Sequence, residues 1–230
     1  MTFWIIGGVI LLVVILAITG AMAEKKRVAG LTAVAAELGL PFDPLADQGL
    51  IDRLASFDLF NQGRSKKTAN MIHGDAGDVT LNIFDYKFTT GSGKNSSTWT
   101  QSVLLLESAA LDLATFAARP EGFFDRVGQA FGAKDIDFDS HPQFSRMFLL
   151  RGVDEAAIRT LFRPEVIEYF ETRPGMSVEG SGRRLLVYQR NKPIAPDEVR
   201  QLMADGLKLH AMWRTESAGG AELAEGGTDG

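Results

Sequence analysis

The first pattern in the chain is an apolar run from Phe3 to Ala23 that contains no charged residue. A helix rises about 1.5 Å per residue, so this run would be roughly 30 Å long, which is the thickness of the hydrocarbon core of a bilayer. A helix in a globular core normally keeps one polar face for water, and this run has none. Trp4 lies near one end, where an indole favours the headgroup region. The pattern predicts a transmembrane helix.

The residues on either side of the run indicate its topology. Only Met1-Thr2 precede it, whereas the basic cluster Lys25-Lys26-Arg27 follows it. Basic residues beside a span tend to stay in the cytoplasm, so we predict a single-pass anchor, a soluble domain in the cytoplasm, and Lys25, Lys26 and Arg27 at the membrane surface. The alternative is a cleaved secretory signal, because Ala21-Met22-Ala23 resembles a cleavage site.

Residues 27–38 carry apolar side chains at helical spacing and are followed by Gly39 and Pro41, which commonly end helices. This helix is expected to continue directly from the apolar run. A second helix is predicted from Leu45 to Phe60, so that residues 24–60 form a juxtamembrane helical segment. The polar residues 61–68 predict a loop.

Residues 69–214 predict a soluble α+β domain made of antiparallel β-hairpins with packed helices. Strands are expected from β-type apolar patterns, with alternation in several of them, at residues 70–73, 79–89, 97–107, 113–118, 144–150, 176–179 and 183–189. Helices are predicted over 121–131, from Asp154, from Pro164, and from Pro196 to Trp213, because Asp and Pro favour helix starts. Residues 215–230 lack bulky apolar side chains and are predicted to be disordered.

Composition excludes one class of partner. The net charge is −5, and most of it comes from four acidic residues of the tail, Glu216, Glu222, Glu225 and Asp229. The folded part is therefore close to neutral, and nucleic acid, which requires a basic surface, is not an expected partner. The chain has no cysteine, which excludes thiol catalysis and fits a reducing compartment.

One acidic segment is a candidate metal site, formed by Asp135, Asp137, Asp139 and His141. In an extended chain the period of two places these side chains on one face, where oxygen ligands could gather around a hard cation. The segment does not fit a calcium loop, because Ser140 replaces the required glycine and Arg146 the final glutamate. The alternative is a solvated strand edge with Ile136 and Phe138 buried.

The remaining motifs predict no catalytic residue and no cofactor. Gly91-Ser92-Gly93-Lys94 lacks the spacing of a phosphate-binding loop and is expected to be an exposed hairpin tip. The histidines His73, His141 and His210 have no metal-binding spacing, and His210 lies on the apolar stripe of the last helix, where packing is expected. Whether the protein is an enzyme stays open.

Three stretches together resemble one group of proteins: the apolar run, the sequence GDAGDVTLNIFDYKFTTGSGK, and the later sequence DIDFDSHPQFSRMFLLRG. The combination resembles bacterial membrane-anchored proteins of uncharacterised function. The resemblance covers most of the soluble part and not the tail. It implies a bacterial source and assigns no site residue.

Three functions follow as hypotheses. The first is a membrane-anchored cytoplasmic interaction or scaffold protein, with the lipid bilayer and an unidentified protein as partners. The alternative is a membrane-tethered metal-dependent hydrolase, in which residues 135–141 would share a pocket with His73 or Asp85. The third is sensing of anionic lipid surfaces through the basic groups at 25–27, 64–67 and 183–184. Each Lys or Arg near an anionic membrane contributes about 1 kcal/mol to the free energy of binding.

Overall fold

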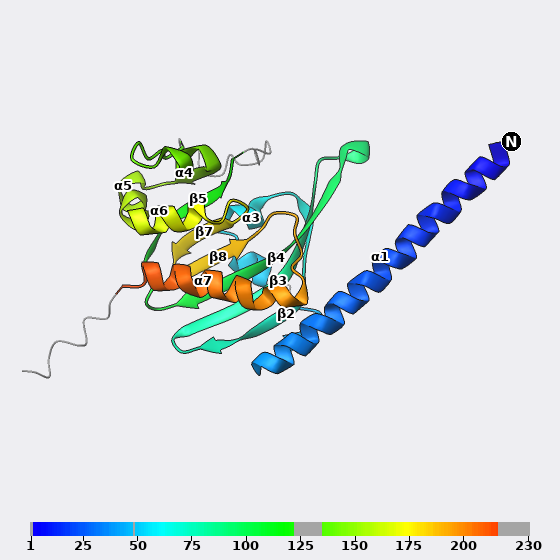
Figure 1. Ribbon diagram of the computed structural model, residues 1–230, viewed down its shortest axis with the longest axis horizontal. Coiled ribbons are helices and arrows are strands. Elements are labelled where there is room, and N and C mark those ends of the chain that lie inside the picture. The colour runs from blue at the N-terminus through cyan, green and yellow to red at the C-terminus, as the bar shows by residue number, and fades with distance from the viewer. Residues whose placement is uncertain (1, 48, 122–134, 216–230) are drawn as a thin grey trace, which may run out of the picture.

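A computed structural model describes residues 2–47, 49–121 and 135–215, without the side chains of residues 2–10 and 13. Eight strands form one sheet in the order β1-β2-β3-β4-β8-β7-β5-β6, and every neighbouring pair is antiparallel (Figure 1). The strands are β1 (Phe42–Asp43), β2 (Arg64–Ala76), β3 (Val79–Thr90), β4 (Ser97–Ser108), β5 (Leu113–Pro120), β6 (Phe148–Gly152), β7 (Ser177–Gly182) and β8 (Arg184–Tyr188).

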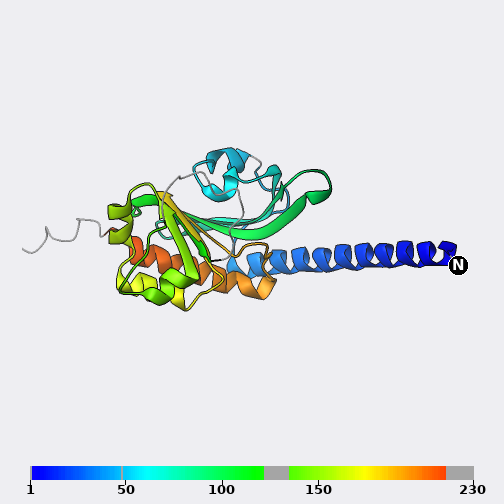
Figure 2. The same cartoon turned by 90° about the horizontal axis from the view of Figure 1, so that it is seen from above.

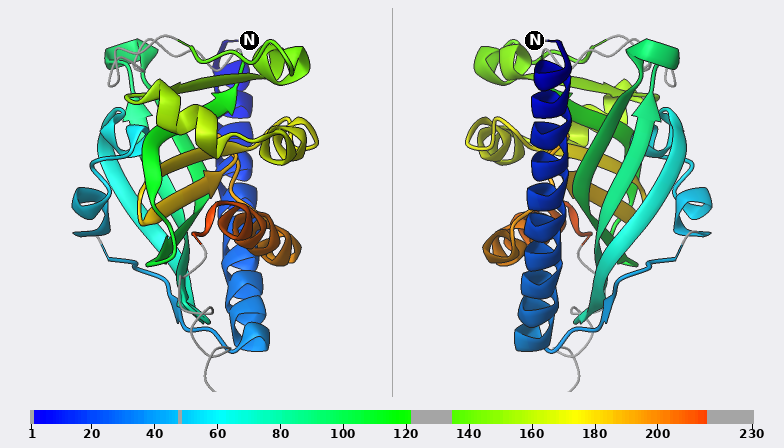
Figure 3. Two further views of the ribbon diagram at one scale, coloured as in Figure 1. Left: turned by 90° about the vertical axis from the view of Figure 1, so that its left-hand side faces the viewer. Right: turned by 90° about the vertical axis from the view of Figure 1, so that its right-hand side faces the viewer.

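Helices cover both faces of this sheet. They are α1 (Thr2–Leu38), α2 (Gly49–Arg53), α3 (Asp58–Asn61), α4 (Pro142–Met147), α5 (Glu155–Leu161), α6 (Pro164–Glu171) and α7 (Val199–Trp213), with short 3-10 turns η1 (Gly93–Asn95) and η2 (Pro196–Glu198). Figure 3 shows α1 and α7 on one side of the sheet and the α2–α3 segment on the other. The sheet therefore separates two hydrophobic cores.

Side chains on opposite faces of the same strands contribute to the two cores. On β3, Leu81 and Ile83 point into the larger core under α1 and α4–α7, whereas Phe84, Tyr86 and Phe88 point into the smaller core under α2 and α3. Successive strand residues face opposite sides of a sheet, so one apolar strand can serve two cores. Aromatic rings fill both spaces, as in the tilted contact of Phe60 with Tyr86 and the edge-on contact of Phe148 with Phe170.

The first helix lies in two environments. Leu31, Val34 and Ala35 are buried in the larger core, and Gly39, in the left-handed conformation at φ +69°, ends the helix as predicted. The other half of α1 projects away from the body as a straight rod (Figures 1 and 2). We call residues 11–23 the apolar arm. Its large side chains are between 46% and 67% exposed and comprise Leu11, Leu12, Val14, Ile15, Leu16, Ile18 and Met22.

The predicted transmembrane helix from Phe3 to Ala23 is wrong, and with it the predicted single-pass topology. Among the residues with described side chains, no helix is both long enough and apolar enough to cross a membrane. The fold class is thus corrected to a mixed α and β domain dominated by one eight-stranded antiparallel sheet.

Two predictions in the β region are also wrong. Residues 61–68 were expected to form a loop, yet β2 begins at Arg64, because backbone pairing with β3 supplies its hydrogen bonds whatever its side chains. Residues 144–150 were expected to form a strand, yet Pro142 begins α4 and the strand β6 starts only at Phe148. A short apolar run fits a buried helix as well as a strand. Apart from Glu121 and Thr215, the predicted helix 121–131 and tail 215–230 lie outside the described residues.

The contact of α7 with the sheet depends on Gly206. A Cβ atom at this position would lie 2.3 Å from Leu104 Cδ2 of β4, so the helix backbone lies directly against the buried Leu104 side chain. Gly206→Val is expected to lower the free energy of unfolding by about 2 kcal/mol through overpacking. Ala204→Val, on the exposed face of the same helix, should cost only about 0.5 kcal/mol of helix propensity. Urea unfolding followed by circular dichroism measures both, and equal losses would contradict this contact.

Candidate functional site

The sheet face under α1 changes character where the helix leaves the body. On β3, the apolar Leu81 and Ile83 are followed on the same face by Asp85 and Lys87. Strand β4 changes at the same level, because Ser102 lies opposite Asp85 in the register while Leu104 lies opposite Ile83. The helix therefore packs on the apolar part of this face and separates from the polar part.

A buried ion pair marks the point of separation. The Arg27 guanidinium contacts the Asp85 carboxylate, with side chains that are 15% and 9% exposed. Asp85 also accepts hydrogen bonds from Asn70 Nδ2 at 2.8 Å and Ser102 Oγ at 2.6 Å. Arg27 Nη1 donates to the carbonyl oxygen of Ile194 at 3.2 Å. We call these side chains, Arg27, Asn70, Asp85 and Ser102, the junction, because they join α1, β2, β3, β4 and the segment before η2.

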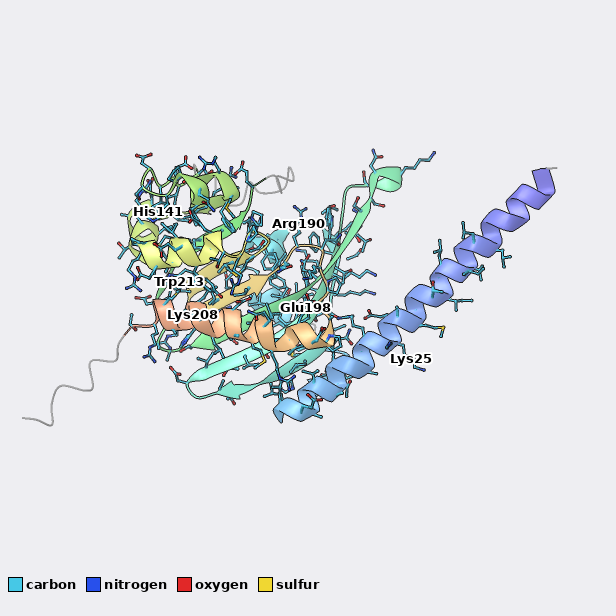
Figure 4. The ribbon with its side chains drawn as sticks, in the orientation of Figure 1. Lys25, His141, Arg190, Glu198, Lys208 and Trp213 are labelled. Carbon is cyan, nitrogen blue, oxygen red and sulfur yellow. The ribbon has the colours of Figure 1, made fainter. Side chains whose placement is uncertain are left out.

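The junction distinguishes one residue of the predicted membrane-surface cluster from the other two. Lys25 and Lys26 are exposed on α1, as a surface role requires, and Lys25 lies where the helix has left the body (Figure 4). Arg27 instead turns into the domain, and its hydrogen bond to Glu24, at 2.8 Å, raises the pKa of its guanidinium against the opposing effect of burial. The same bond lowers the pKa of Glu24.

A groove of about 480 Å³ opens beside the junction, between the base of the apolar arm and the polar face of β2, β3 and β4. Its charged lining consists of Glu24, Arg27, Lys67, Asp85 and Lys87. Three cationic side chains thus face two carboxylates. We call this the basic groove.

A second buried charge network lies on the opposite face of the sheet. Glu179, only 1% exposed, accepts hydrogen bonds from Arg119 Nη2 at 2.7 Å, Tyr188 Oη at 2.8 Å and the backbone N–H of Asp58 at 2.7 Å. Arg119 also pairs with the Asp58 carboxylate at 2.9 Å. Burial raises the pKa of Asp58 and of Tyr188 above their ordinary values. Each of these charged side chains has a partner within the network, although Arg119 Nε has none among the described residues, and the network joins β5, β7 and β8 to the start of α3.

The predicted metal ligands are not brought together. Within residues 2–47, 49–121 and 135–215, no group of three or more acidic or histidine side chains could hold a metal ion. Asp135 Oδ1 accepts a hydrogen bond from Leu150 N at 3.0 Å, and burial raises its pKa. Asp137 and Asp139 are exposed, and His141 Nδ1 lies 2.9 Å from Ser140 Oγ.

The acidic segment instead covers the edge of the sheet. Besides the Asp135 contact, Ile136 N donates to the carbonyl oxygen of Leu150 on the edge strand β6 at 2.8 Å. Covering an edge strand prevents it from pairing with another chain. His141 lies on the far side of the body from Lys25 (Figure 4), and Asp85 is held in the junction, so the segment shares no pocket with it.

The two other histidines have no catalytic arrangement. His73 lies on β2 opposite Asn82, half-buried. His210 is 6% exposed on α7 beside the larger core, as its place on the apolar stripe predicted. Its Nε2 atom has no hydrogen-bond partner among the described residues, and burial lowers its pKa from the ordinary value of 6.5. The predicted hairpin tip at 91–94 connects β3 to β4.

Sequence patterns missed the junction and the network around Glu179. A signal for the first was present, because Asp85 interrupts the apolar alternation that runs from Val79 to Ile83 on β3. An acidic residue that continues a buried face requires a cationic partner. Nothing in the local pattern indicates that the partner is Arg27, which is 58 positions away.

No protein-family model matches the sequence, and no curated protein matches it significantly. Among solved structures, the crystal structure of the mycobacterial trehalose monomycolate transport factor A, TtfA, is similar, with a TM-score of 0.55 and 12% sequence identity. The similarity covers 81% of this chain and 91% of that chain. At this identity the likeness shows the fold alone, and the resemblance to uncharacterised bacterial proteins stays a prediction.

Removal of the Asp85 carboxylate tests the junction. Asp85→Ala leaves the guanidinium of Arg27 without its buried partner, so the free energy of unfolding should fall by about 3 kcal/mol. Glu37→Ala is the matched control, because Glu37 also joins α1 to another element, through Arg200 at 3.0 Å, but both side chains are more than half exposed. Its loss should stay below about 1 kcal/mol. Urea denaturation of the full chain measures both, and equal losses would show that the junction is not a stabilising contact.

The buried imidazole of His210 predicts a pH dependence of stability. Its folded pKa lies below 6.5, so the unfolded state binds more protons, and stability must fall as the pH falls below about 6.5. His210→Leu should reduce the fall in the urea midpoint between pH 7.5 and pH 5.5. His141→Gln, at a half-buried histidine outside the core, should leave that fall unchanged. If the urea midpoint of His210→Leu falls as much as that of the wild type between pH 7.5 and pH 5.5, His210 is not the source of the pH dependence.

Proposed function

We propose that this protein is a non-enzymatic, membrane-associated interaction protein, whose body is held at a lipid bilayer by the apolar arm of α1. The observation that carries the proposal is the arm itself, which exposes large apolar side chains outside the body. Soluble monomers rarely expose apolar surface of this extent, and such surface marks a contact with an apolar partner.

The distribution of the side chains favours lipid over a protein partner. Val14, Ile15 and Leu16 are consecutive and all exposed, and successive residues of a helix point about 100° apart. Together with Ile18 they spread over about 200° of the circumference of the arm. The apolar stripe of a helix that packs on protein is typically narrower, somewhat over about 100°, whereas acyl chains can surround a helix, and burial of each such side chain is worth about 1.5–3 kcal/mol.

The residues after the arm support the same partner. Lys25 and Lys26 follow the arm after Glu24, and both are exposed. Ammonium groups next to a lipid-embedded segment interact favourably with anionic headgroups, by about 1 kcal/mol each. The β3–β4 hairpin projects from the same side of the body as the arm (Figures 1 and 2), so that this side would face the lipid. Placement of the body in the cytoplasm stays a prediction.

An interaction or scaffold role fits the described side chains better than the alternative enzymatic role. The similar solved protein is described as a transport factor, and that role is said of that protein alone. The alternative function, a metal-dependent hydrolase, requires clustered carboxylates, and the described residues contain no group of three or more that could hold a metal ion. No observation on the described side chains favours the hydrolase over an interaction role.

Charges placed in the arm test the proposal. The double substitution Ile15→Asp with Leu16→Asp removes two apolar contacts with lipid, so partitioning into neutral phosphatidylcholine vesicles should fall by at least about 100-fold. The matched control is Leu45→Asp with Val153→Asp, because these side chains are 79% and 77% exposed on the body itself. The measurement is the fraction of full-length protein that floats with vesicles in a density gradient. Equal flotation of the two double variants would refute attachment through the arm.

A further inference from the structure

The basic groove contains two lysines that face each other. Lys67 of β2 and Lys87 of β3 are directly opposite in the antiparallel register, and both line the groove. Side chains opposite each other in an antiparallel pair share one face, with Cβ atoms about 5 Å apart, and like charges in this arrangement destabilise a sheet. The strand pair therefore holds an electrostatic repulsion that a bound anion would relieve.

Neither lysine is neutralised within the part of the chain that the structure describes. Both side chains are exposed, and no ion pair or hydrogen bond involves either ammonium group. The neighbouring Lys66 differs, because its Nζ donates to the carbonyl oxygen of Phe60 at 2.6 Å. The two ammonium groups of the groove thus remain available to a ligand.

The two carboxylates of the groove do not neutralise Lys67 and Lys87, because both are bound to other groups. Glu24 is hydrogen-bonded to Arg27 Nε at 2.9 Å and Nη2 at 2.8 Å. Asp85 is held by Arg27, Asn70 and Ser102 in the junction. Arg27 lies between the two acids and compensates both in part, so Lys67 and Lys87 leave the groove with a net positive charge of one.

The groove also lies at a defined level relative to the apolar arm. Glu24, which lines it, is the residue directly after the end of the arm at Ala23. If the arm lies in the acyl region of a bilayer, the groove lies at the level of the headgroups, where phosphate groups are concentrated. Thr100, opposite Lys87 on β4, adds a hydroxyl to the same lining.

We propose that the basic groove binds a phosphate group, with Lys67 and Lys87 as its ammonium ligands. Lysine binds phosphate as a compact point charge, and two lysines on adjacent strands match a tetrahedral anion that presents several oxygens. The phosphate belongs either to an anionic phospholipid headgroup or to a free phosphate anion. The lipid source rests on the proposed function, whereas the anion site rests on the groove alone.

Thermal unfolding of the full chain in neutral dodecyl maltoside micelles tests the site. A ligand that binds only the folded state raises Tm, and saturation should give about 5 °C for a domain of this size. Three probes are used: inorganic phosphate, phosphatidylglycerol mixed into the micelles, and diacylglycerol, which has acyl chains and no phosphate. Diacylglycerol should not raise Tm.

Three variants separate a built site from general surface charge. Lys67→Gln with Lys87→Gln should abolish the rise and leave the Tm without probe equal to or above that of the wild type, because the repulsion is gone. A merely structural role of the lysines would instead lower that Tm. Lys87→Glu should also abolish the rise while forming a cross-strand pair with Lys67. Lys25→Gln with Lys26→Gln removes the same charge outside the groove and should retain the rise.

Each outcome decides between the sources. A rise with both phosphate probes, or with phosphatidylglycerol alone, supports the site with the headgroup as a ligand. A rise with inorganic phosphate alone supports the anion site and overturns the lipid source. No rise with either probe, or a rise that persists in the Lys67→Gln and Lys87→Gln variant, overturns the proposal. The flotation assay in neutral vesicles depends on the arm and not on the groove. It therefore tests the proposed function independently of the phosphate site.

Discussion

The ion pair between Arg27 and Asp85 is the interaction on which the arrangement of this protein depends. It lies where α1 leaves the sheet, and it ties the helix to three strands and to the segment before η2. On one side of it, Leu31 and Val34 pack in the larger core; on the other, no described side chain of α1 belongs to either core. Because a buried guanidinium requires a partner, the pair sets the point at which the helix stops packing and starts to project. Both the apolar arm and the basic groove follow from that point.

The body beside this junction is densely packed on both faces of the sheet. One sheet shared by two cores places every apolar strand residue against side chains above or below it, and the network around Glu179 ties β5, β7 and β8 together from within. The acidic segment, which the sequence marked as a candidate metal site, covers the edge strand β6 through Asp135 and Ile136. The polar groups of the interior therefore serve the fold. Within the part of the chain that the structure describes, the arm and the groove both present groups to a partner, and they lie beside each other.

The local sequence pattern was sufficient to predict part of the fold and little of the candidate site. Strands β3 and β4 were predicted almost to the residue, because β3 alternates between apolar and polar positions and β4 carries a β-type run of Thr, Val and Leu. The predictions failed where packing overrides pattern, as in β2, whose polar start pairs with β3, and in α4, whose apolar residues suit a helix as well as a strand. The basic cluster after the apolar run was recognised, yet Arg27 could not be separated from Lys25 and Lys26, because only its partner on β3 distinguishes it.

The sequence by itself determined the apolar character of the N-terminal run, the antiparallel β content, the helix end at Gly39 and the absence of thiol chemistry, since each depends on residue type or on short-range spacing. Only the tertiary structure decided the strand order, the pairing of Arg27 with Asp85, the opposition of Lys67 to Lys87, and the role of residues 135–141 as an edge cover. These features join positions far apart in the chain. The register of the sheet brings these positions together. It results from packing of the whole domain and cannot be predicted from a local sequence pattern.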